Sequence, residues 1–209
     1  MTGAAGLPDL PPPLDDVVGI VLAGGRSARF GADKLAVEVD GRPLLHHAIE
    51  AVATVARSVI VVAAPGANPA LPAGLEDRVR VVNDPENFGG PLVGLAAALA
   101  DADAPIALVV GGDMPRMVPL VLRRLVATIG HGRPAVSLEI PGRIHPLPMA
   151  LDVAAARSAA AVVLERGGRA LRDLLHELGA VSIPALVWLA LDPAGVTIVD
   201  IDRPEDLGS

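Results

Sequence analysis

The order in which apolar runs and helical stretches follow one another constrains the fold of this chain most. Short runs rich in Val, Ile and Leu recur along the first 130 residues, and each is followed by a loop and a stretch with helical spacing of apolar residues. The expected strands cover residues 17–22, 58–62, 80–83 and 106–110. Apolar strands that alternate with helices are typical of a parallel sheet covered on both faces. The sequence therefore predicts an α/β domain.

Helical spacing of apolar residues also predicts where the helices lie. After Pro43, the apolar positions 44, 45, 48, 49 and 52 would form one buried face. The other helices are expected after Pro91 and over residues 118–129, 154–164, 170–178 and 204–207. Three further strands are expected over residues 135–138, 147–151 and 197–201. We expect residues 1–16 to form a flexible tail and residues 17–209 to form a single domain.

The composition argues against several classes of function. The chain has no cysteine, which excludes disulfides, thiolate nucleophiles and cysteine-ligated zinc. The formal net charge of -7 argues against a nucleic-acid or membrane-surface partner, and the 1% of aromatic residues leaves few rings to stack on bases. No apolar run is long enough to span a bilayer, and residues 1–16 lack the basic start of a signal peptide. These features predict a cytoplasmic protein.

The loop after the first expected strand carries the groups needed to hold a polyphosphate. Gly24 and Gly25 can bring backbone N–H groups close to a ligand, and Arg26, Arg29 and Lys34 follow. Backbone donors combined with cations are typical of phosphate sites, and an ammonium suits a phosphate leaving group. The spacing fits neither a P-loop nor the dinucleotide fingerprint. The alternative is an ordinary turn with surface charges, and Arg26 fits both interpretations equally well.

Acidic residues follow three of the expected strands. Because ligands bind beyond the carboxyl ends of parallel strands, Asp84 and Asp113 would lie at the same edge as the glycine loop. Asp113 follows an apolar strand and suits a hard cation such as Mg²⁺, although it could also cap a helix. Asp84 fits a ligand-binding position or a turn before Pro85. Asp202 could complete a metal site or cap the short helix that follows it.

Two other residues are candidates for contact with an anionic substrate. His145 lies in a Pro-rich loop between two expected strands, and Arg169 lies in the Gly-containing segment that joins two expected helices. An exposed loop histidine and a simple turn are the alternatives. The spacing identifies no Ser/His/Asp nucleophile set and no glycosidase-like pair of carboxylates.

The ordered motifs resemble those of the molybdenum cofactor guanylyltransferases. Residues 22–34, LAGGRSARFGADK, are similar to the family signature L-A-G-G-x-S-x-R-M-G-x-D-K. Further matches occur, in order, at residues 41–45 (GRPLL), 84, 90–94 (GPLVG), 113–115 (DMP), 145–147 (HPL), 168–171 (GRAL) and 202–207 (DRPEDL). The resemblance covers residues 18–207, and the chain departs from the family pattern at Phe30, at Ala63-Ala64, and at Asp200 and Asp202.

The resemblance implies a fold, a reaction and a set of site residues. The fold would be a three-layer Rossmann-like nucleotidyltransferase fold with a mostly parallel central sheet. The reaction would transfer GMP from GTP to molybdenum-molybdopterin, with Mg²⁺ and release of pyrophosphate. The implied nucleotide-binding residues are Leu22, Ala23, Gly24, Gly25, Lys34, Asp84 and Asp113. By the resemblance, Lys34 would bind the phosphates and Asp113 would hold Mg²⁺. Together with the candidates drawn from the residues themselves, the predicted catalytic residues are Lys34, Arg29 and Asp113, the metal ligands Asp113 and Asp202, and the acceptor-binding residues His145 and Arg169.

Several related functions remain open at this point. The Gly24-Gly25 pair resembles the guanylyl branch, whereas cytidylyl relatives more often have Ala-Ala-Gly there. The alternatives are a cytidylyltransferase for the molybdenum cofactor, a guanylyltransferase for another phosphorylated acceptor, and a nucleotide-binding chaperone or regulator without catalysis. The presence of Lys34, Asp84 and Asp113 argues against the last of these. The implied partners are GTP, a molybdopterin-type acceptor, and a molybdoenzyme or cofactor-insertion protein that receives the product.

Overall fold

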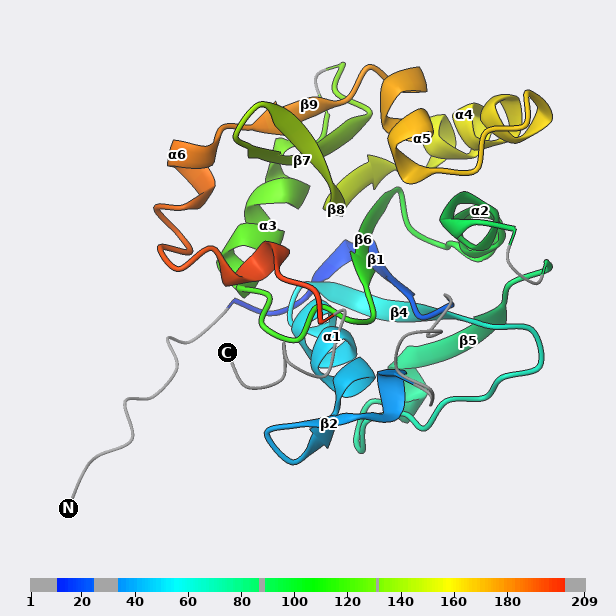
Figure 1. Cartoon of the computed structure of the whole chain (residues 1–209), viewed down its shortest axis with the longest axis vertical. Helices are drawn as coiled ribbons and strands as arrows, with labels where there is room; N and C mark the ends of the chain where they lie inside the picture. The colour runs from blue at the N-terminus through cyan, green and yellow to red at the C-terminus, as the bar shows by residue number, and fades with distance from the viewer. Residues whose placement is uncertain (1–10, 25–33, 87–88, 131, 202–209) are drawn as a thin grey trace.

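The computed structural model describes residues 11–24, 34–86, 89–130 and 132–201. Seven strands form the central sheet, in the order β5-β4-β1-β6-β8-β7-β9 (Figure 1). They are β1 (Leu14–Leu22), β4 (Ala56–Ala63), β5 (Val79–Asn83), β6 (Ile106–Gly111), β7 (Ala135–Ile140), β8 (Arg143–Asp152) and β9 (Val181–Ile183). Strand β8 alone runs antiparallel to its neighbours, so the predicted α/β fold with a mostly parallel sheet is confirmed.

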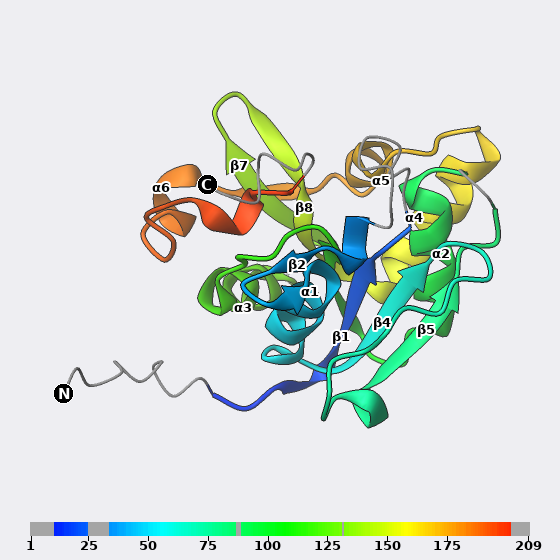
Figure 2. The ribbon, with the colours of Figure 1, turned by 60° about the horizontal axis from the view of Figure 1, so that its bottom comes forward.

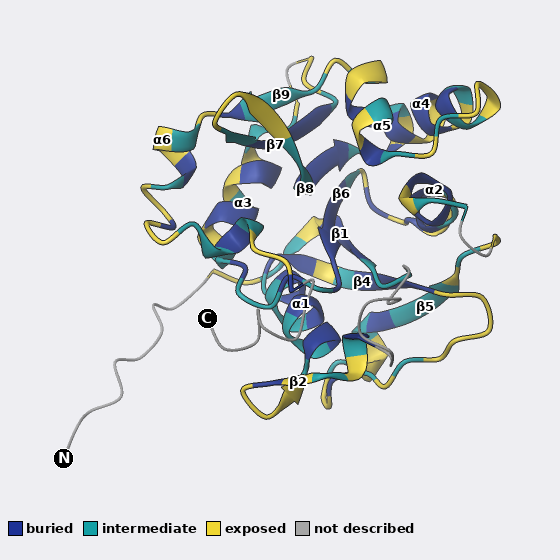
Figure 3. Cartoon of the chain, in the orientation of Figure 1, coloured by how far each residue is buried: buried dark blue, intermediate teal, exposed yellow. Residues whose placement is uncertain are grey.

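Helices cover both faces of the sheet. The helices are α1 (Leu44–Ala53), α2 (Pro91–Asp101), α3 (Pro119–Thr128), α4 (Val153–Glu165), α5 (Leu171–Glu177) and α6 (Ala185–Trp188). Short elements complete the fold: the 3-10 helices η1 (Lys34–Ala36), η2 (Glu76–Arg78) and η3 (Val196–Ile198), and the ribbon of β2 (Glu38–Val39) and β3 (Arg42–Pro43). Helices α1, α3 and α6 pack on one face and α2, α4 and α5 on the other, with their buried sides toward the sheet (Figure 3).

Strand β1 shows why the apolar runs predict buried strands. Its alternate residues point to opposite faces: Val17 and Val21 belong to the core under α1 and α3, whereas Ile20 belongs to the core under α2. Helix α1 approaches β1 at Gly19, where a Cβ atom would lie 2.1 Å from Cγ1 of Val52. The missing side chain at Gly19 therefore sets how closely α1 packs on the central strand.

The structure departs from the predicted elements mainly in the last third of the chain. The two strands expected there form the β7–β8 hairpin, but β8 begins at Arg143, so His145 belongs to a strand and the predicted loop is wrong. Figure 2 shows this hairpin extending past the end of β1. Residues 197–201 do not form the expected strand. The 3-10 helix η3 ends at Ile198, and the remaining residues pair with no strand, although the side chain of Ile201 is buried.

The outermost strand next to β7 is β9, which the sequence did not predict; its Val181 and Ile183 pair with β7 in parallel. At the other end of the chain, β1 begins at Leu14, earlier than predicted, and the Leu14 N–H donates to the carbonyl of Val55 at 2.7 Å. The expected helix at 204–207 lies outside the described residues. Within the described part of the chain, no helix is long and apolar enough to cross a membrane. The cytoplasmic location stays a prediction.

Candidate functional site

The carboxyl ends of β1 and β6 lie side by side at one edge of the sheet. Leu22 pairs with Gly111, and the N–H of Gly112 donates to the Leu22 carbonyl at 3.0 Å. On the other side of β1, the N–H of Ala23 donates to the Val62 carbonyl of β4 at 2.8 Å. A Cβ atom at Gly112 would lie 3.4 Å from the Ala23 Cα, so glycine permits this close approach. The glycine loop therefore starts between the ends of β4 and β6.

An ion pair joins the two residues that the sequence singled out most strongly. The Nζ of Lys34, in η1, lies 2.9 Å from Oδ2 of Asp113, although the two residues are 79 positions apart. The side chain of Lys34 is 10% exposed and that of Asp113 is 31% exposed. Lys34 is the only lysine of the chain; every other Lys or Arg position is an arginine. A compact ammonium, rather than a planar guanidinium, is thus held almost buried beside a partly open carboxylate.

The local chain fixes Asp113 on both sides. Its carbonyl accepts a hydrogen bond of 2.9 Å from the N–H of Ile201. Met114 is buried, and its sulfur accepts from the Gly111 N–H at 3.4 Å. A Cβ atom at Gly111 would lie 2.6 Å from Oδ1 of Asp113, so the carboxylate lies directly over a residue without a side chain. The position of this carboxylate depends on the tight turn that follows β6.

Asp84 lies at the same edge of the sheet, at the end of β5. Its N–H donates to the Ala63 carbonyl at 2.8 Å, and its Oδ1 accepts from the N–H of Glu86 at 3.0 Å. Helix α2 can approach it because residue 94 is glycine: a Cβ atom at Gly94 would lie 3.3 Å from Oδ2 of Asp84 and 2.8 Å from Cγ1 of Val62. The residues that shape this corner are therefore glycines and a turn carboxylate.

Asp84 and Asp113 are too far apart to bind one ion together. Strands β4 and β1 lie between β5 and β6, and three inter-strand spacings correspond to about 14 Å. Among the described residues, no three His, Asp or Glu side chains form a group that could hold a metal ion. Mg²⁺ usually keeps several waters and takes only one or two carboxylates together with substrate phosphates. The partly exposed carboxylate of Asp113, next to the ammonium of Lys34, fits Mg²⁺ in this respect.

His145 lies on the opposite side of Asp113 from Asp84. Strand β8 is the neighbour of β6, and the pairs between them end at Val109 and Met149, so His145 extends past the end of β6. Its Nδ1 contacts the carbonyl of Leu147, and its own carbonyl accepts from the hydroxyl of Ser137. The structure thus places this histidine at the predicted edge, on a strand instead of a loop.

Arg169 contacts the start of α2 through its backbone. Its carbonyl accepts a hydrogen bond of 3.1 Å from Leu92, in the first turn of α2. A Cβ atom at Gly90 would lie 2.9 Å from the Arg169 Cβ. The guanidinium donates to the carbonyls of Leu164 and Gly168 at 3.1 and 3.0 Å, which ties it to the end of α4. Arg169 therefore holds the start of α2, and its predicted contact with the acceptor stays a prediction.

Four of the predicted site residues lie outside the described residues. They are Gly25, Arg26, Arg29 and Asp202. The sequence analysis also missed Ile201, which is buried and whose N–H donates to the Asp113 carbonyl. Its apolar character is a signal for burial in general, but it does not indicate which partner the residue contacts.

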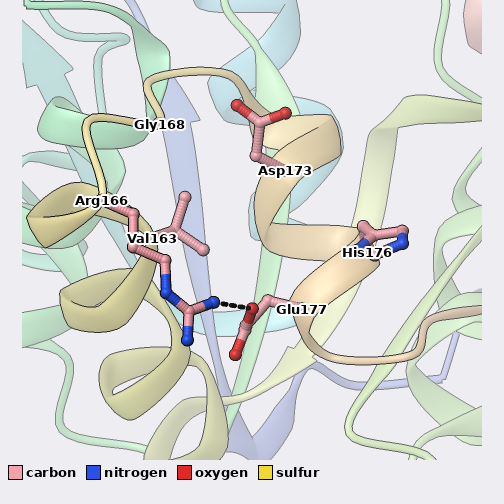
Figure 4. Close-up of a pocket in the computed structure, with 6 residues that line it drawn as sticks. All are labelled: Val163, Arg166, Gly168, Asp173, His176 and Glu177. Atoms are coloured by element: carbon pink, nitrogen blue, oxygen red, sulfur yellow. Dashed lines mark hydrogen bonds and ion pairs between the residues drawn. The ribbon is translucent and has the colours of Figure 1, made fainter.

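An open pocket of about 260 Å³ lies between α4 and α5, and none of the predicted site residues lines it, although Arg169 directly follows its residue Gly168 (Figure 4). It is lined by Val163, Arg166, Gly168, Asp173, His176 and Glu177. Arg166 and Glu177 form an ion pair of 3.1 Å, while the side chains of Asp173 and His176 point away from that pair. The charged groups therefore do not converge on one point, and the pocket has no evident ligand chemistry.

Comparisons with known proteins agree on one family. The family model described as "MobA-like NTP transferase domain" matches residues 19–181. A "Probable molybdenum cofactor guanylyltransferase" from Chloroflexus aggregans is 32% identical over 199 residues, which cover 90% of each chain.

Two solved structures share the fold. Molybdopterin-guanine dinucleotide biosynthesis protein A from Archaeoglobus fulgidus has a TM-score of 0.74 at 23% identity, and the match covers 91% of this chain and 95% of that one. The 2-C-methyl-D-erythritol 4-phosphate cytidylyltransferase from Thermus thermophilus has a TM-score of 0.66 at 23% identity, and the match covers 90% and 94%. Because one of these proteins is named for cytidylyl transfer, the fold alone does not decide which nucleotide is used.

Proposed function

The chain belongs to the family of MobA-like NTP transferases, and we propose that it is a molybdenum cofactor guanylyltransferase that transfers GMP from GTP to molybdenum-molybdopterin. The ion pair between Lys34 and Asp113, at the carboxyl edge of β1 and β6, is the observation that carries this proposal. It combines a cation for the triphosphate with a carboxylate that suits Mg²⁺, at the place where parallel sheets bind their ligands. The Chloroflexus aggregans relative, a probable molybdenum cofactor guanylyltransferase, supports the choice of guanylyl transfer.

The reaction requires no nucleophile from the protein. A terminal phosphate oxygen of the acceptor forms a bond to the α-phosphorus of GTP, and the bond from that phosphorus to the bridging oxygen of the β-phosphate breaks. Pyrophosphate leaves with the electron pair of that bond. Catalysis then consists of positioning two anions and stabilising the charge that develops on the leaving group.

Each residue of the edge has a proposed part in this reaction. The Lys34 ammonium binds the β- and γ-phosphates and stabilises the departing pyrophosphate, together with Arg29 and the N–H groups after Ala23. Asp113 would hold Mg²⁺, and the ion would supply positive charge that lowers the repulsion between the nucleotide and the acceptor phosphate. Asp202 is the second candidate for contact with the ion.

The order of the residues along the edge supports an orientation for the two substrates. Asp84, which directly follows β5, is about three strand spacings, or roughly 14 Å, from Asp113. This separation favours a contact of Asp84 with the nucleoside end of GTP. Gly24 and Lys34 would contact the triphosphate between them. His145, on the far side of Asp113, would contact the acceptor, with Arg169 as the other candidate.

The proposal is tested by a transfer assay with purified protein. The chain is incubated with molybdopterin, molybdate, Mg²⁺ and one of GTP, CTP, ATP or UTP, and the dinucleotide and pyrophosphate are quantified by chromatography and mass spectrometry. We expect a guanine dinucleotide and an equal amount of pyrophosphate with GTP. A preference for CTP would favour the cytidylyl alternative, and nucleotide binding without pyrophosphate release would favour a non-catalytic role.

A further inference from the structure

Residues 192–201, here called the 192–201 segment, bond Asp113 directly and share an apolar cluster with the residue that follows Lys34. Near its end, the Ile201 N–H donates to the carbonyl of Asp113 at 2.9 Å. The side chain of the same residue is 1% exposed and packs in a small cluster with Val39 and Leu44. Leu35, which directly follows Lys34, packs against this cluster. Ile201 thus belongs through its side chain to the cluster that receives Leu35, and it bonds Asp113 through its backbone.

A second set of buried polar contacts fixes the segment itself. Asp192 is 2% exposed, and its Oδ2 accepts from the Thr197 N–H at 2.8 Å. Thr197 is fully buried, and its hydroxyl accepts from the N–H of Val118 at 3.1 Å, immediately before α3 begins. Buried polar groups that are satisfied in this way hold a segment in one conformation, because breaking the contact leaves a donor without a partner.

The loop between β6 and α3 is therefore held at both ends by the 192–201 segment. Ile201 bonds its start at Asp113, and Thr197 bonds its end at Val118. In Figure 1 the segment, coloured orange to red, crosses in front of α3 and ends above α1. None of these contacts is needed to close the sheet, since the segment forms no strand in the described residues.

We infer that the 192–201 segment is a positioning element for the ion pair, with Ile201 as its main positioning residue. This inference rests on the proposed function in one respect: the ion pair is the part of the site that binds the nucleotide and its metal. Lys34 and Asp113 come from distant parts of the chain. Ile201 connects the Asp113 backbone to the apolar cluster against which Leu35, the residue after Lys34, packs, and neither contact involves a charge. The segment sets their separation, so that a triphosphate and its ion meet both groups at once.

The inference is tested with Ile201→Ala and a matched control, Ile183→Ala. Ile183 is also buried, at 4% exposure, but it lies on β9, the outermost strand of the sheet and three strands away from β6. Hydrogen exchange of the backbone amides is followed in peptides that cover residues 34–37 and 111–118. We expect faster exchange in both peptides for Ile201→Ala, and wild-type exchange in both for Ile183→Ala.

Kinetics give a second readout that a general loss of stability would not move. For Ile201→Ala we expect KM for GTP and the Mg²⁺ concentration for half-maximal rate to rise about ten-fold, as for a small misplacement of binding groups. The control should lower only the melting temperature. If Ile201→Ala does not fold, Ile201→Val should shift the same quantities in the same direction, by about three-fold.

The outcomes separate this inference from the proposed function. Unchanged exchange at residues 34–37 and 111–118 in the Ile201 variant would overturn the inference, as would kinetic constants equal to those of the control. If the wild-type chain transfers no nucleotide, the proposed function fails, and the exchange experiment alone still decides whether the 192–201 segment holds the two groups.

Discussion

Replacing Lys34 by methionine should change the binding of metal and of nucleotide in opposite directions. Methionine keeps an unbranched side chain of similar length but removes the ammonium. In the structure that ammonium lies 2.9 Å from Oδ2 of Asp113, so it competes with a cation for the same oxygen. Without nucleotide, Lys34→Met should therefore bind a free divalent ion more tightly. With nucleotide, it should bind GTP more weakly, because a contact with the phosphates is lost.

The magnitude follows from the exposure of the pair. Two unit charges 4 Å apart interact by about 1 kcal/mol in bulk water and about 4 kcal/mol near a protein surface. Lys34 is nearly buried, but the Asp113 side chain is 31% exposed, so water screens part of the interaction. An intermediate value of about 1.4–2.8 kcal/mol corresponds to a ten- to hundred-fold gain in affinity for the free ion. Loss of a charge-assisted bond to phosphate costs about 1.5–3 kcal/mol, a similar factor against GTP.

Two titrations measure these effects. Mn²⁺ binding to the nucleotide-free protein is followed by electron paramagnetic resonance, and binding of a fluorescent GTP analogue is followed at saturating Mg²⁺. Arg57→Met is the matched control, because Arg57 also loses an ion pair, of 3.3 Å with Asp103, that does not involve Asp113. The control should bind both ligands as the wild type does.

Parallel changes would refute the reasoning. If Lys34→Met binds both Mn²⁺ and the GTP analogue more weakly, the lysine supports the fold of the site instead of competing for the carboxylate. If neither affinity changes relative to Arg57→Met, Lys34 does not contact the ligands at all.

Three further substitutions test other parts of the account. Asp113→Asn should reduce kcat at least about 100-fold in the transfer assay while the melting temperature stays within a few degrees, and near wild-type turnover would remove Asp113 from the mechanism. Gly111→Ala places a Cβ atom 2.6 Å from Oδ1 of Asp113. It should lower kcat with little change in the free energy of unfolding. A loss of stability without a loss of kcat would contradict the assigned position of the carboxylate. Arg123→Met should lower the free energy of unfolding, measured in urea, by about 1–3 kcal/mol, because Arg123 donates a partly buried hydrogen bond of 2.8 Å to the Thr54 carbonyl. KM for GTP should stay unchanged, and an altered KM would connect that contact to the site.

The first four strands of the sheet could be predicted because their signal is local. Each contains a short run rich in Val, Ile or Leu that is followed by a loop, and a parallel sheet brings the ends of such runs to one edge. Lys34 and Asp113 were therefore expected at the same edge before their contact was known, and the structure brings them to 2.9 Å. Their chemical roles stay predictions.

The last third of the chain could not be read as well, for physical reasons. The Pro-rich segment that ends at Pro146 favoured a loop around His145 because proline cannot donate to a β-ladder, yet β8 runs through Pro146 with an irregular register against β7. Strand β9 has only three residues, too few for a periodic pattern. Ile198, Val199 and Ile201 suggested a strand, but only Thr197 and Ile201 of this stretch are buried. Their contacts with Val118 and with the cluster of Val39 and Leu44 come from distant parts of the chain, which a single sequence does not show.

A crystal structure with Mn²⁺ and a non-hydrolysable GTP analogue tests the central claim most directly. The account predicts an anomalous manganese peak on the carboxylate of Asp113, with the Lys34 ammonium transferred from that carboxylate to the triphosphate. A bound nucleotide that leaves the ion pair intact, with its phosphates and the manganese elsewhere, would contradict the account.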